Sequence, residues 1–159
     1  MVDASVVIKW FVFDSPDEED TDEALELLRA YRDDRIDLYQ PPIWRAEVLA
    51  VLARIVPDKV DHYTWKLLAF DHTEAAGSSV YLKAVQLVTQ LNQHLFDTIY
   101  HAAALTHPSA TLITADQKYR IKAESFGRVL SLKRWGEVFY NHCGLTADPP
   151  CLHLKTDSD

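Results

Sequence analysis

The chain has 159 residues, of which 24 are acidic and 16 are lysine or arginine, giving a formal net charge of −8. This length suffices for one domain with a hydrophobic core but not for two. The composition, 48% hydrophobic and 25% charged, is that of a globular protein. No apolar run is long enough to span a membrane, no signal peptide is visible, and the two cysteines do not form a disulfide framework. We therefore expect a cytoplasmic protein with no membrane partner.

The negative charge is concentrated near the start of the chain. Residues 1–40 contain 12 acidic and 4 basic residues, whereas residues 41–159 contain 12 of each. Basic residues gather further on, at Lys118, Arg120, Lys122, Arg128, Lys133 and Arg134. Two interpretations of this basic cluster stay open, namely a solvated face and a surface that contacts phosphate groups.

The first half of the chain is predicted to alternate short strands with helices. In order, we expect a strand over 1–4, a helix over 6–12, a helix over 21–33, a strand over 36–39 and a helix between Pro42 and Pro57. Ser5 is expected to cap the first helix. Asp20 and Glu23 fit a capping box at the start of the second helix, with Asp in place of Ser or Thr.

The second half is predicted to continue in the same way. In order, we expect helices over 58–72 and 80–92, a helix that ends near His107, a strand over 111–114, a helix over 117–125 and a strand over 129–132. Asp97 is expected to cap the helix that ends near His107. The strand T-L-I-T has an apolar centre, which indicates burial on both faces. The stretch from about 70 to 80 has no apolar run and is expected to be a loop.

These elements predict the fold class. Short strands that alternate with helices in one small domain indicate an α/β sandwich with a largely parallel sheet of four or five strands, flanked by helices. We expect this domain to cover residues 1–140. Residues 141–159 show little periodicity and are expected to form an irregular tail.

Four acidic residues stand beside apolar sequence and are the main functional signal. Asp3 follows the first strand, Glu47 lies early in an apolar helix, Asp97 opens another, and Asp116 follows the strand T-L-I-T. Carboxylates next to core segments are costly unless they are paired or bind a cation. In open α/β sheets such groups meet outside the carboxyl ends of the strands. We therefore predict that the four carboxylates form one site for a hard divalent cation.

Such a site suggests phosphodiester chemistry. Two divalent ions about 4 Å apart can activate water and stabilise the leaving oxygen, with the carboxylates as ligands. All-oxygen ligands suit Mg²⁺ and Mn²⁺ alike. His101 is four residues after Asp97, so it either approaches the metals or the phosphate or is a solvated or hydrogen-bonded helix residue. Each acid taken alone also has an ordinary interpretation as a helix cap or a surface charge.

Four motifs in order carry a family resemblance: V-D-A-S-V-V-I-K-W-F, P-P-I-W-R-A-E-V-L-A-V-L, F-D-T-I-Y-H-A-A-A-L and L-I-T-A-D-Q-K-Y. Together they resemble a PIN-domain ribonuclease, most closely a VapC-type toxin of a toxin–antitoxin pair, over residues 2 to about 135. Two features depart from the family pattern. Only two residues precede Asp3, so the first strand is abbreviated or the true start lies upstream. The stretch near 70–80 lacks the usual apolar strand, which favours four strands.

The resemblance implies a fold, an activity and partners. It implies a PIN-like three-layer sandwich and a Mg²⁺- or Mn²⁺-dependent endoribonuclease that cuts tRNA or ribosomal RNA. It also implies a homodimer and a cognate antitoxin that covers the active site. By motif match, Asp3, Glu47, Asp97 and Asp116 are the catalytic metal ligands. Ser5 and Thr114 match supporting hydroxyls, and Lys118, Arg120 and Lys122 are the expected RNA contacts.

Three other functions compete with this interpretation. A catalytically silent PIN-like scaffold that binds RNA or protein predicts the loss of one or more acids, but all four are present. A signalling receiver domain needs an acidic pair beside its first strand. A phosphatase of the haloacid dehalogenase type needs D-x-D there. The residues after Asp3 are Ala4 and Ser5, which fit neither of the last two.

Overall fold

The parallel strand pairs at the centre of the molecule are short. The computed structural model describes residues 1–13 and 19–142. Strand β1 (Tyr39–Gln40) pairs with β2 (Thr73–Glu74), and β3 (Leu112–Thr114) pairs with β4 (Val129–Ser131). Both pairs are parallel, and Val2 forms a parallel bridge to Ile113. The predicted class, an α/β fold with a parallel sheet, is therefore confirmed.

The segment 1–3 joins the two strand pairs. On one side, the backbone N–H groups of Asp3 and Ile113 donate to the carbonyl oxygens of Ile113 and Met1, both at 2.9 Å. On the other side, the fully buried Gln40 side chain takes the place of a strand ladder. Its Nε2 donates to the Val2 carbonyl and its Oε1 accepts from the Val2 N–H, both at 2.9 Å. The resulting order across the sheet is β2, β1, segment 1–3, β3 and β4.

The prediction of a loop over residues 70 to 80 is wrong in one respect, because this stretch contains a short strand. Thr73 and Glu74 form β2, although both are exposed and neither is apolar. The strand is held by its neighbour, because the N–H groups of Thr73 and Ala75 donate to the carbonyls of Leu38 and Gln40 at 2.8 Å. This is an edge strand made by backbone pairing, so no hydrophobic pattern marks it.

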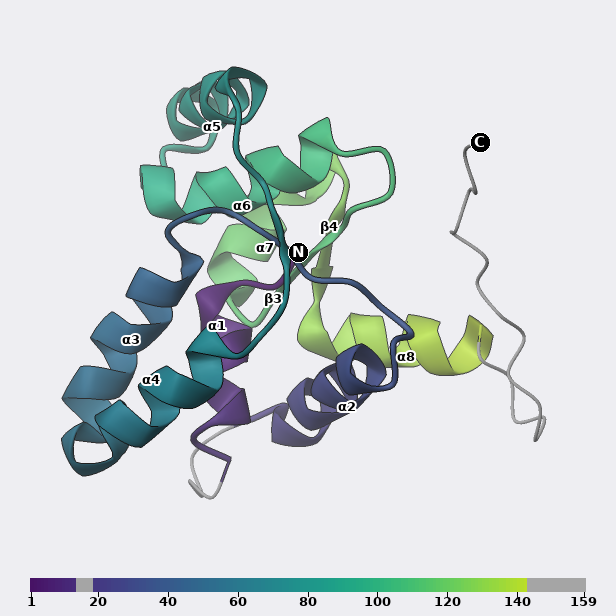
Figure 1. Cartoon of the computed structure of the whole chain (residues 1–159). Coiled ribbons are helices and arrows are strands. Elements are labelled where there is room, and N and C mark those ends of the chain that lie inside the picture. The colour runs from purple at the N-terminus through teal and green to yellow at the C-terminus, as the bar shows by residue number, and fades with distance from the viewer. Residues whose placement is uncertain (14–18, 143–159) are drawn as a thin grey trace, which may run out of the picture.

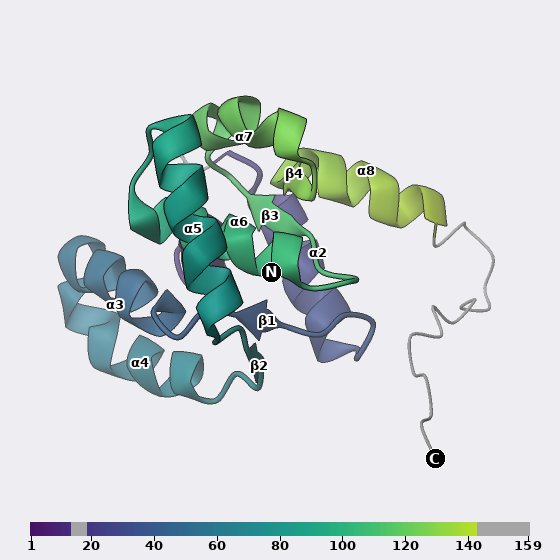
Figure 2. The ribbon, with the colours of Figure 1, turned by 90° about the horizontal axis from the view of Figure 1, so that it is seen from above.

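Helices cover both sides of these strands (Figure 1). They are α1 (Ala4–Val7), α2 (Thr21–Arg32), α3 (Trp44–Ile55), α4 (Val60–Leu68), α5 (Ser78–Leu91), α6 (Leu95–Thr106), α7 (Gln117–Ala123) and α8 (Leu132–His142), with 3₁₀ turns at Ile8–Trp10, Pro57–Lys59 and Glu124–Phe126. Helices α5 and α6 lie on one side of β3 and β4, and α2 and α8 lie on the other. Seen from above, α5 runs along α6, while α3 and α4 form a pair at the side (Figure 2).

Helix α6 is the central helix of the fold. All residues from Thr98 to Ala104 are buried, so the helix is covered on every side. Its run of three alanines lets neighbouring elements approach closely. Helix α6 therefore holds whatever its first turn carries in a fixed position.

Two predicted helix starts and one predicted helix cap are wrong. Helix α1 begins after Asp3 and not after Ser5. Helix α6 begins after His94, which places Asp97 in the first turn and not at the cap. Asp20 precedes α2 in a left-handed conformation and makes no side-chain capping bond. Helices α1 and α6 start two and three residues before the predicted positions, whereas α2 starts at Thr21 as predicted and lacks only the predicted cap.

The core draws on most of the described chain, from Met1 to Trp135. Helix α8 continues to His142, and the remainder of the predicted tail, from residue 143 on, lies outside the described residues. Within residues 1–13 and 19–142, no helix is both long and apolar enough to cross a bilayer.

Candidate active site

The four predicted acids all lie at the beginnings of helices. Asp3 directly precedes α1 and Asp116 directly precedes α7. Glu47 and Asp97 lie in the first turns of α3 and α6. The N-terminal end of a helix carries a partial positive charge that favours a carboxylate. Four such ends supply these acids from positions far apart in the chain.

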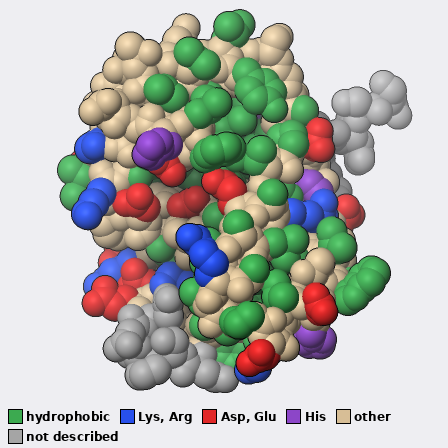
Figure 3. All heavy atoms as spheres, turned by 90° about the vertical axis from the view of Figure 1, so that its left-hand side faces the viewer, with side chains coloured by type: hydrophobic (Ala, Val, Ile, Leu, Met, Phe, Trp, Pro, Cys, Tyr) green, Lys and Arg blue, Asp and Glu red, His purple; other side chains and the backbone are tan. Residues whose placement is uncertain are grey.

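The structure brings the four carboxylates into one electrostatic cluster. The negative charge of Asp3 raises the pKa of both Glu47 and Asp97, and Asp116 acts in the same direction on Asp3 and Asp97. On the side of the molecule where α3 and α4 lie in Figure 1, acidic side chains gather across the middle of the surface (Figure 3). The four acids thus influence one another electrostatically, and their role as one metal site stays a prediction.

Asp3 is held by two hydroxyl groups. Ser5 Oγ and Thr114 Oγ1 both donate to Asp3 Oδ2, at 2.6 and 2.7 Å. Each hydroxyl oxygen also accepts a backbone N–H, Ser5 from Ala115 at 3.2 Å and Thr114 from Asp116 at 3.0 Å. Burial raises the pKa of Asp3, and the two hydroxyl bonds oppose that rise only in part. The hydroxyls predicted to support the site thus connect Asp3 with the loop that carries Asp116.

Glu47 is held by Tyr100. The Tyr100 hydroxyl donates to Glu47 Oε2 at 2.5 Å. Burial raises the pKa of Glu47, with smaller contributions from the charges of Asp3 and Asp97, while the Tyr100 bond acts in the opposite direction. Burial and the charge of Glu47 also raise the pKa of Tyr100, so the hydroxyl keeps its proton and donates.

Asp97 and Asp116 are bound to backbone groups. Burial raises the pKa of Asp97, and the nearby charge of Asp3 adds to the rise, while His94 lowers it. The His94 backbone also hydrogen-bonds Asp97, as expected for an acid in the first turn that reaches back to the cap. Asp116 caps α7, with Oδ1 accepting the Tyr119 N–H at 2.9 Å. The ordinary capping role weighed for Asp116 is thus present alongside its place in the cluster.

The donor chemistry fits a hard divalent cation. All four groups offer carboxylate oxygen, and three have a raised pKa that a cation would reverse. The ion pairs found between described residues occupy other acids, Glu26, Asp33, Glu124 and Glu137. Among residues 1–13 and 19–142, however, no three Asp, Glu, His or Cys side chains lie close enough to share one ion as they stand.

His101 is a structural residue of α6. It is fully buried, and its Nε2 lies 2.8 Å from the Gly127 carbonyl oxygen while Nδ1 lies 3.1 Å from the Tyr119 hydroxyl. A carbonyl only accepts, so Nε2 carries the proton and Nδ1 accepts from Tyr119. Burial lowers the pKa of His101, which keeps the ring neutral. The hydrogen-bonded interpretation of His101 is therefore confirmed.

The predicted RNA contacts follow Asp116 on α7. Lys118 and Lys122 are exposed. The Arg120 guanidinium is partly engaged, by Gln117 Oε1 at 3.0 Å and by Glu124 Oε1 at 3.3 Å. Two lysines on this short helix are thus directed to solvent beside the acidic cluster.

Sequence reasoning missed Tyr100 and Gln40. Tyr100 lies three residues after Asp97, on the same side of α6, and is the one hydroxyl-bearing aromatic residue in a helix of mainly apolar side chains. That spacing was an available signal. Gln40 had no comparable signal, because its two bonds reach a segment 38 residues away.

A carboxylate cluster at the helix starts of an α/β fold with parallel strands offers the oxygen donors that hard divalent cations prefer. The chain matches the PIN domain family over residues 1–124, and it therefore belongs to that family. PIN domains are generally nucleases and commonly use Mg²⁺ or Mn²⁺. A search of curated proteins found no match to this chain.

Proposed function

We propose that this protein is a Mg²⁺- or Mn²⁺-dependent endoribonuclease and the toxin of a VapC-like toxin–antitoxin pair. The observation that carries the proposal is the set of four carboxylates, three with a raised pKa, that gather at helix starts. Asp3, Glu47, Asp97 and Asp116 would hold the metal. When bound, the metal supplies a Lewis acid that activates water and stabilises the leaving oxygen of a phosphodiester.

The other residues prepare the cluster for this task. Ser5 and Thr114 orient Asp3. Asp116 caps α7, and the same helix carries the exposed Lys118 and Lys122, which we propose contact phosphate groups of the RNA. A charge of −4 without a cation would repel RNA, so metal binding and substrate binding should be coupled. Structured RNA such as tRNA or ribosomal RNA is the proposed substrate, in the cytoplasm.

Cleavage of labelled tRNA and ribosomal RNA tests the proposal. Wild-type protein and Asp97→Asn would be incubated with RNA in Mg²⁺, in Mn²⁺ and in EDTA. We expect metal-dependent cleavage by the wild type and a loss of at least 100-fold in the variant, in line with removal of an essential electrostatic group. If the folded wild type binds the RNA and never cuts it, the catalytically silent scaffold is the better description.

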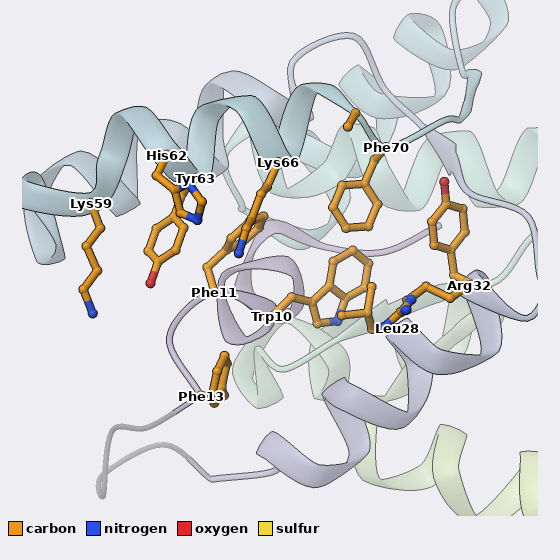
Figure 4. A pocket seen from close by; sticks show the side chains of 12 residues that line it. Trp10, Phe11, Phe13, Leu28, Arg32, Lys59, His62, Tyr63, Lys66 and Phe70 are labelled. Atoms are coloured by element: carbon orange, nitrogen blue, oxygen red, sulfur yellow. The ribbon is translucent and has the colours of Figure 1, made fainter.

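A groove lined by residues outside the acidic cluster supports an antitoxin partner. It has a volume of roughly 700 Å³ and runs between α4, α2 and the segment after α1 (Figure 4). Within the groove the rings of Trp10 and Phe70 stack with their centroids 5.4 Å apart, and the Tyr31 ring stacks on Phe70 with a centroid distance of 5.5 Å. Lys59, Lys66 and Arg32 line the same groove. An apolar floor with basic residues around it suits an amphipathic segment with acidic residues, which we propose the antitoxin supplies.

Co-expression tests the partner. A small protein encoded next to this one should restore growth of cells that express the wild type and should co-purify with it. Charge reversal of Lys59 and Lys66 to Glu should weaken the complex at least tenfold, whereas the matched reversal of Lys133 on α8 should not. Equal affinity of all three proteins would remove the groove from the proposal.

A patch on α5 supports the proposed homodimer. Tyr81, Leu82 and Val85 are 45, 67 and 56% exposed on this helix. Hydrophobic side chains gather in the upper part of Figure 3, at the height of α5 in Figure 1. Exposed apolar groups that cluster mark interaction surfaces. Light scattering should give a dimer for the wild type and for Ile121→Lys, whose site is equally exposed on α7, and a monomer for Leu82→Lys.

A further inference from the structure

We infer that Tyr100 is a positioning residue, whose hydroxyl holds the Glu47 carboxylate where it binds the metal and thereby sets the metal affinity of the site. The inference rests on the proposed function and deepens it, because it concerns how this chain preorganises one ligand. Tyr100 is uncharged at neutral pH and is not one of the four acids of the cluster.

The geometry of the pair supports this role. The Tyr100 side chain is 1% exposed, and its hydroxyl lies 2.5 Å from Glu47 Oε2. Such a short contact between a hydroxyl and a carboxylate is a charge-assisted hydrogen bond. The bond engages Oε2, and Oε1 is the oxygen through which we expect Glu47 to bind the cation. The hydrogen bond from Tyr100 therefore orients the Glu47 carboxylate and leaves Oε1 available as a metal ligand.

The burial of α6 fixes the position of the Tyr100 hydroxyl that bonds Glu47. A glutamate side chain loses considerable rotamer freedom when it is ordered, because it has several rotatable bonds. Tyr100 is fixed by packing inside the most buried helix of the fold. Asp97 lies one turn earlier on the same helix. Helix α6 thus presents one proposed ligand directly and fixes a second, from α3, at a constant spacing.

A purely architectural role is the alternative, since the bond also ties α3 to α6. The two roles predict different responses. A bond with a purely architectural role contributes to the unfolding free energy whether or not the metal is bound. A positioning bond changes metal affinity, and it does so only while Glu47 is present to be positioned. A double-mutant cycle separates them.

Mn²⁺ binding by the purified apo protein is the experiment. Calorimetric titration into the millimolar range would compare the wild type, Tyr100→Phe, Glu47→Ala and the double variant. The phenylalanine keeps the ring and its packing and removes only the hydroxyl. We expect Mn²⁺ affinity to fall at least tenfold in Tyr100→Phe, as removal of groups that orient ligands commonly does. The double variant should bind no more weakly than Glu47→Ala alone.

Tyr39→Phe is the matched control, since it removes a tyrosine hydroxyl from β1 and should leave Mn²⁺ affinity within twofold of the wild type. Thermal unfolding of each apo protein confirms that the variants are folded. Unchanged affinity in Tyr100→Phe, or an equal loss with and without Glu47, overturns the inference while the proposed function stands. A wild type that binds no Mn²⁺ overturns the proposed function together with the inference.

Discussion

Thr114 and Asp3 are 111 residues apart in the chain, yet Thr114 Oγ1 donates a 2.7 Å hydrogen bond to Asp3 Oδ2. The same hydroxyl accepts the Asp116 N–H, so one buried side chain connects the Asp3 carboxylate with the backbone of Asp116. The connection is possible because Thr114 ends β3 directly beside the segment that begins the chain. Parallel pairing of these two segments therefore places both acids at one edge.

Thr114→Val should lower both stability and activity. Valine has nearly the same shape but leaves the Asp3 carboxylate and the Asp116 N–H without the hydroxyl, and a buried hydrogen bond to a charged group is worth about 2 kcal/mol. Urea unfolding at pH 7 in EDTA should give a loss of about that size. Thr106→Val, whose hydroxyl bonds only within α6, should lose less than half as much. Equal losses would argue against a special role for Thr114.

Asp97→Asn should stabilise the apo protein at neutral pH. The pKa of Asp97 in the unfolded chain is near 3.8, and the folded value is higher. Between these values the folded state holds a proton that the unfolded state has lost, so the unfolding free energy falls as pH rises through this window and stays lower above it. Asparagine does not titrate, so the unfolding free energy of the variant does not fall through this pH window on account of residue 97.

Thermal unfolding in EDTA from pH 3 to 8 measures this effect. The unfolding midpoint of Asp97→Asn should exceed that of the wild type at pH 7. The gap should shrink toward pH 3, where both forms of residue 97 are neutral. A variant that is less stable than the wild type at pH 7 would contradict the direction of the pKa shift.

His101→Leu should destabilise the fold and leave metal binding alone. The substitution removes both ring nitrogens, so the Gly127 carbonyl and the Tyr119 hydroxyl lose their buried partner, at a cost of about 2–3 kcal/mol. Denaturant unfolding should report that loss. Mn²⁺ affinity of the folded variant should stay within about threefold of the wild type, and a larger change would place His101 in the metal site after all.

Gln40→Leu should weaken the junction between β1 and the segment 1–3. Leucine fills the buried space but leaves the Val2 N–H and carbonyl without partners, which costs about 2–4 kcal/mol. Hydrogen exchange of the Val2 amide should accelerate strongly relative to that of Ile113, whose bond to Met1 is untouched. Retained protection at Val2 would mean that another group replaces the amide.

Much of the fold was predictable because its signals are local. The apolar stripes of α2, α3 and α5 predict these helices, and the apolar stretch T-L-I-T predicts a buried strand. The strand β2 was not predictable, since Thr73 and Glu74 are polar and exposed and form a strand only because β1 offers backbone partners. Cap positions failed for a similar reason, because Asp3 and His94 adopt extended backbone geometry that neighbouring segments impose.

By itself the sequence determined that four acids stand next to apolar segments in an α/β chain, and from strand ends it determined which edge they share. Hydrophobic burial and hydrogen-bond satisfaction operate along short stretches, so these features can be read from spacing. Only the tertiary structure decided how each carboxylate is held. Tyr100 reaches Glu47 across 53 residues and Thr114 reaches Asp3 across 111. Such partners depend on distances between elements, which packing around α6 and the pairing of β3 establish.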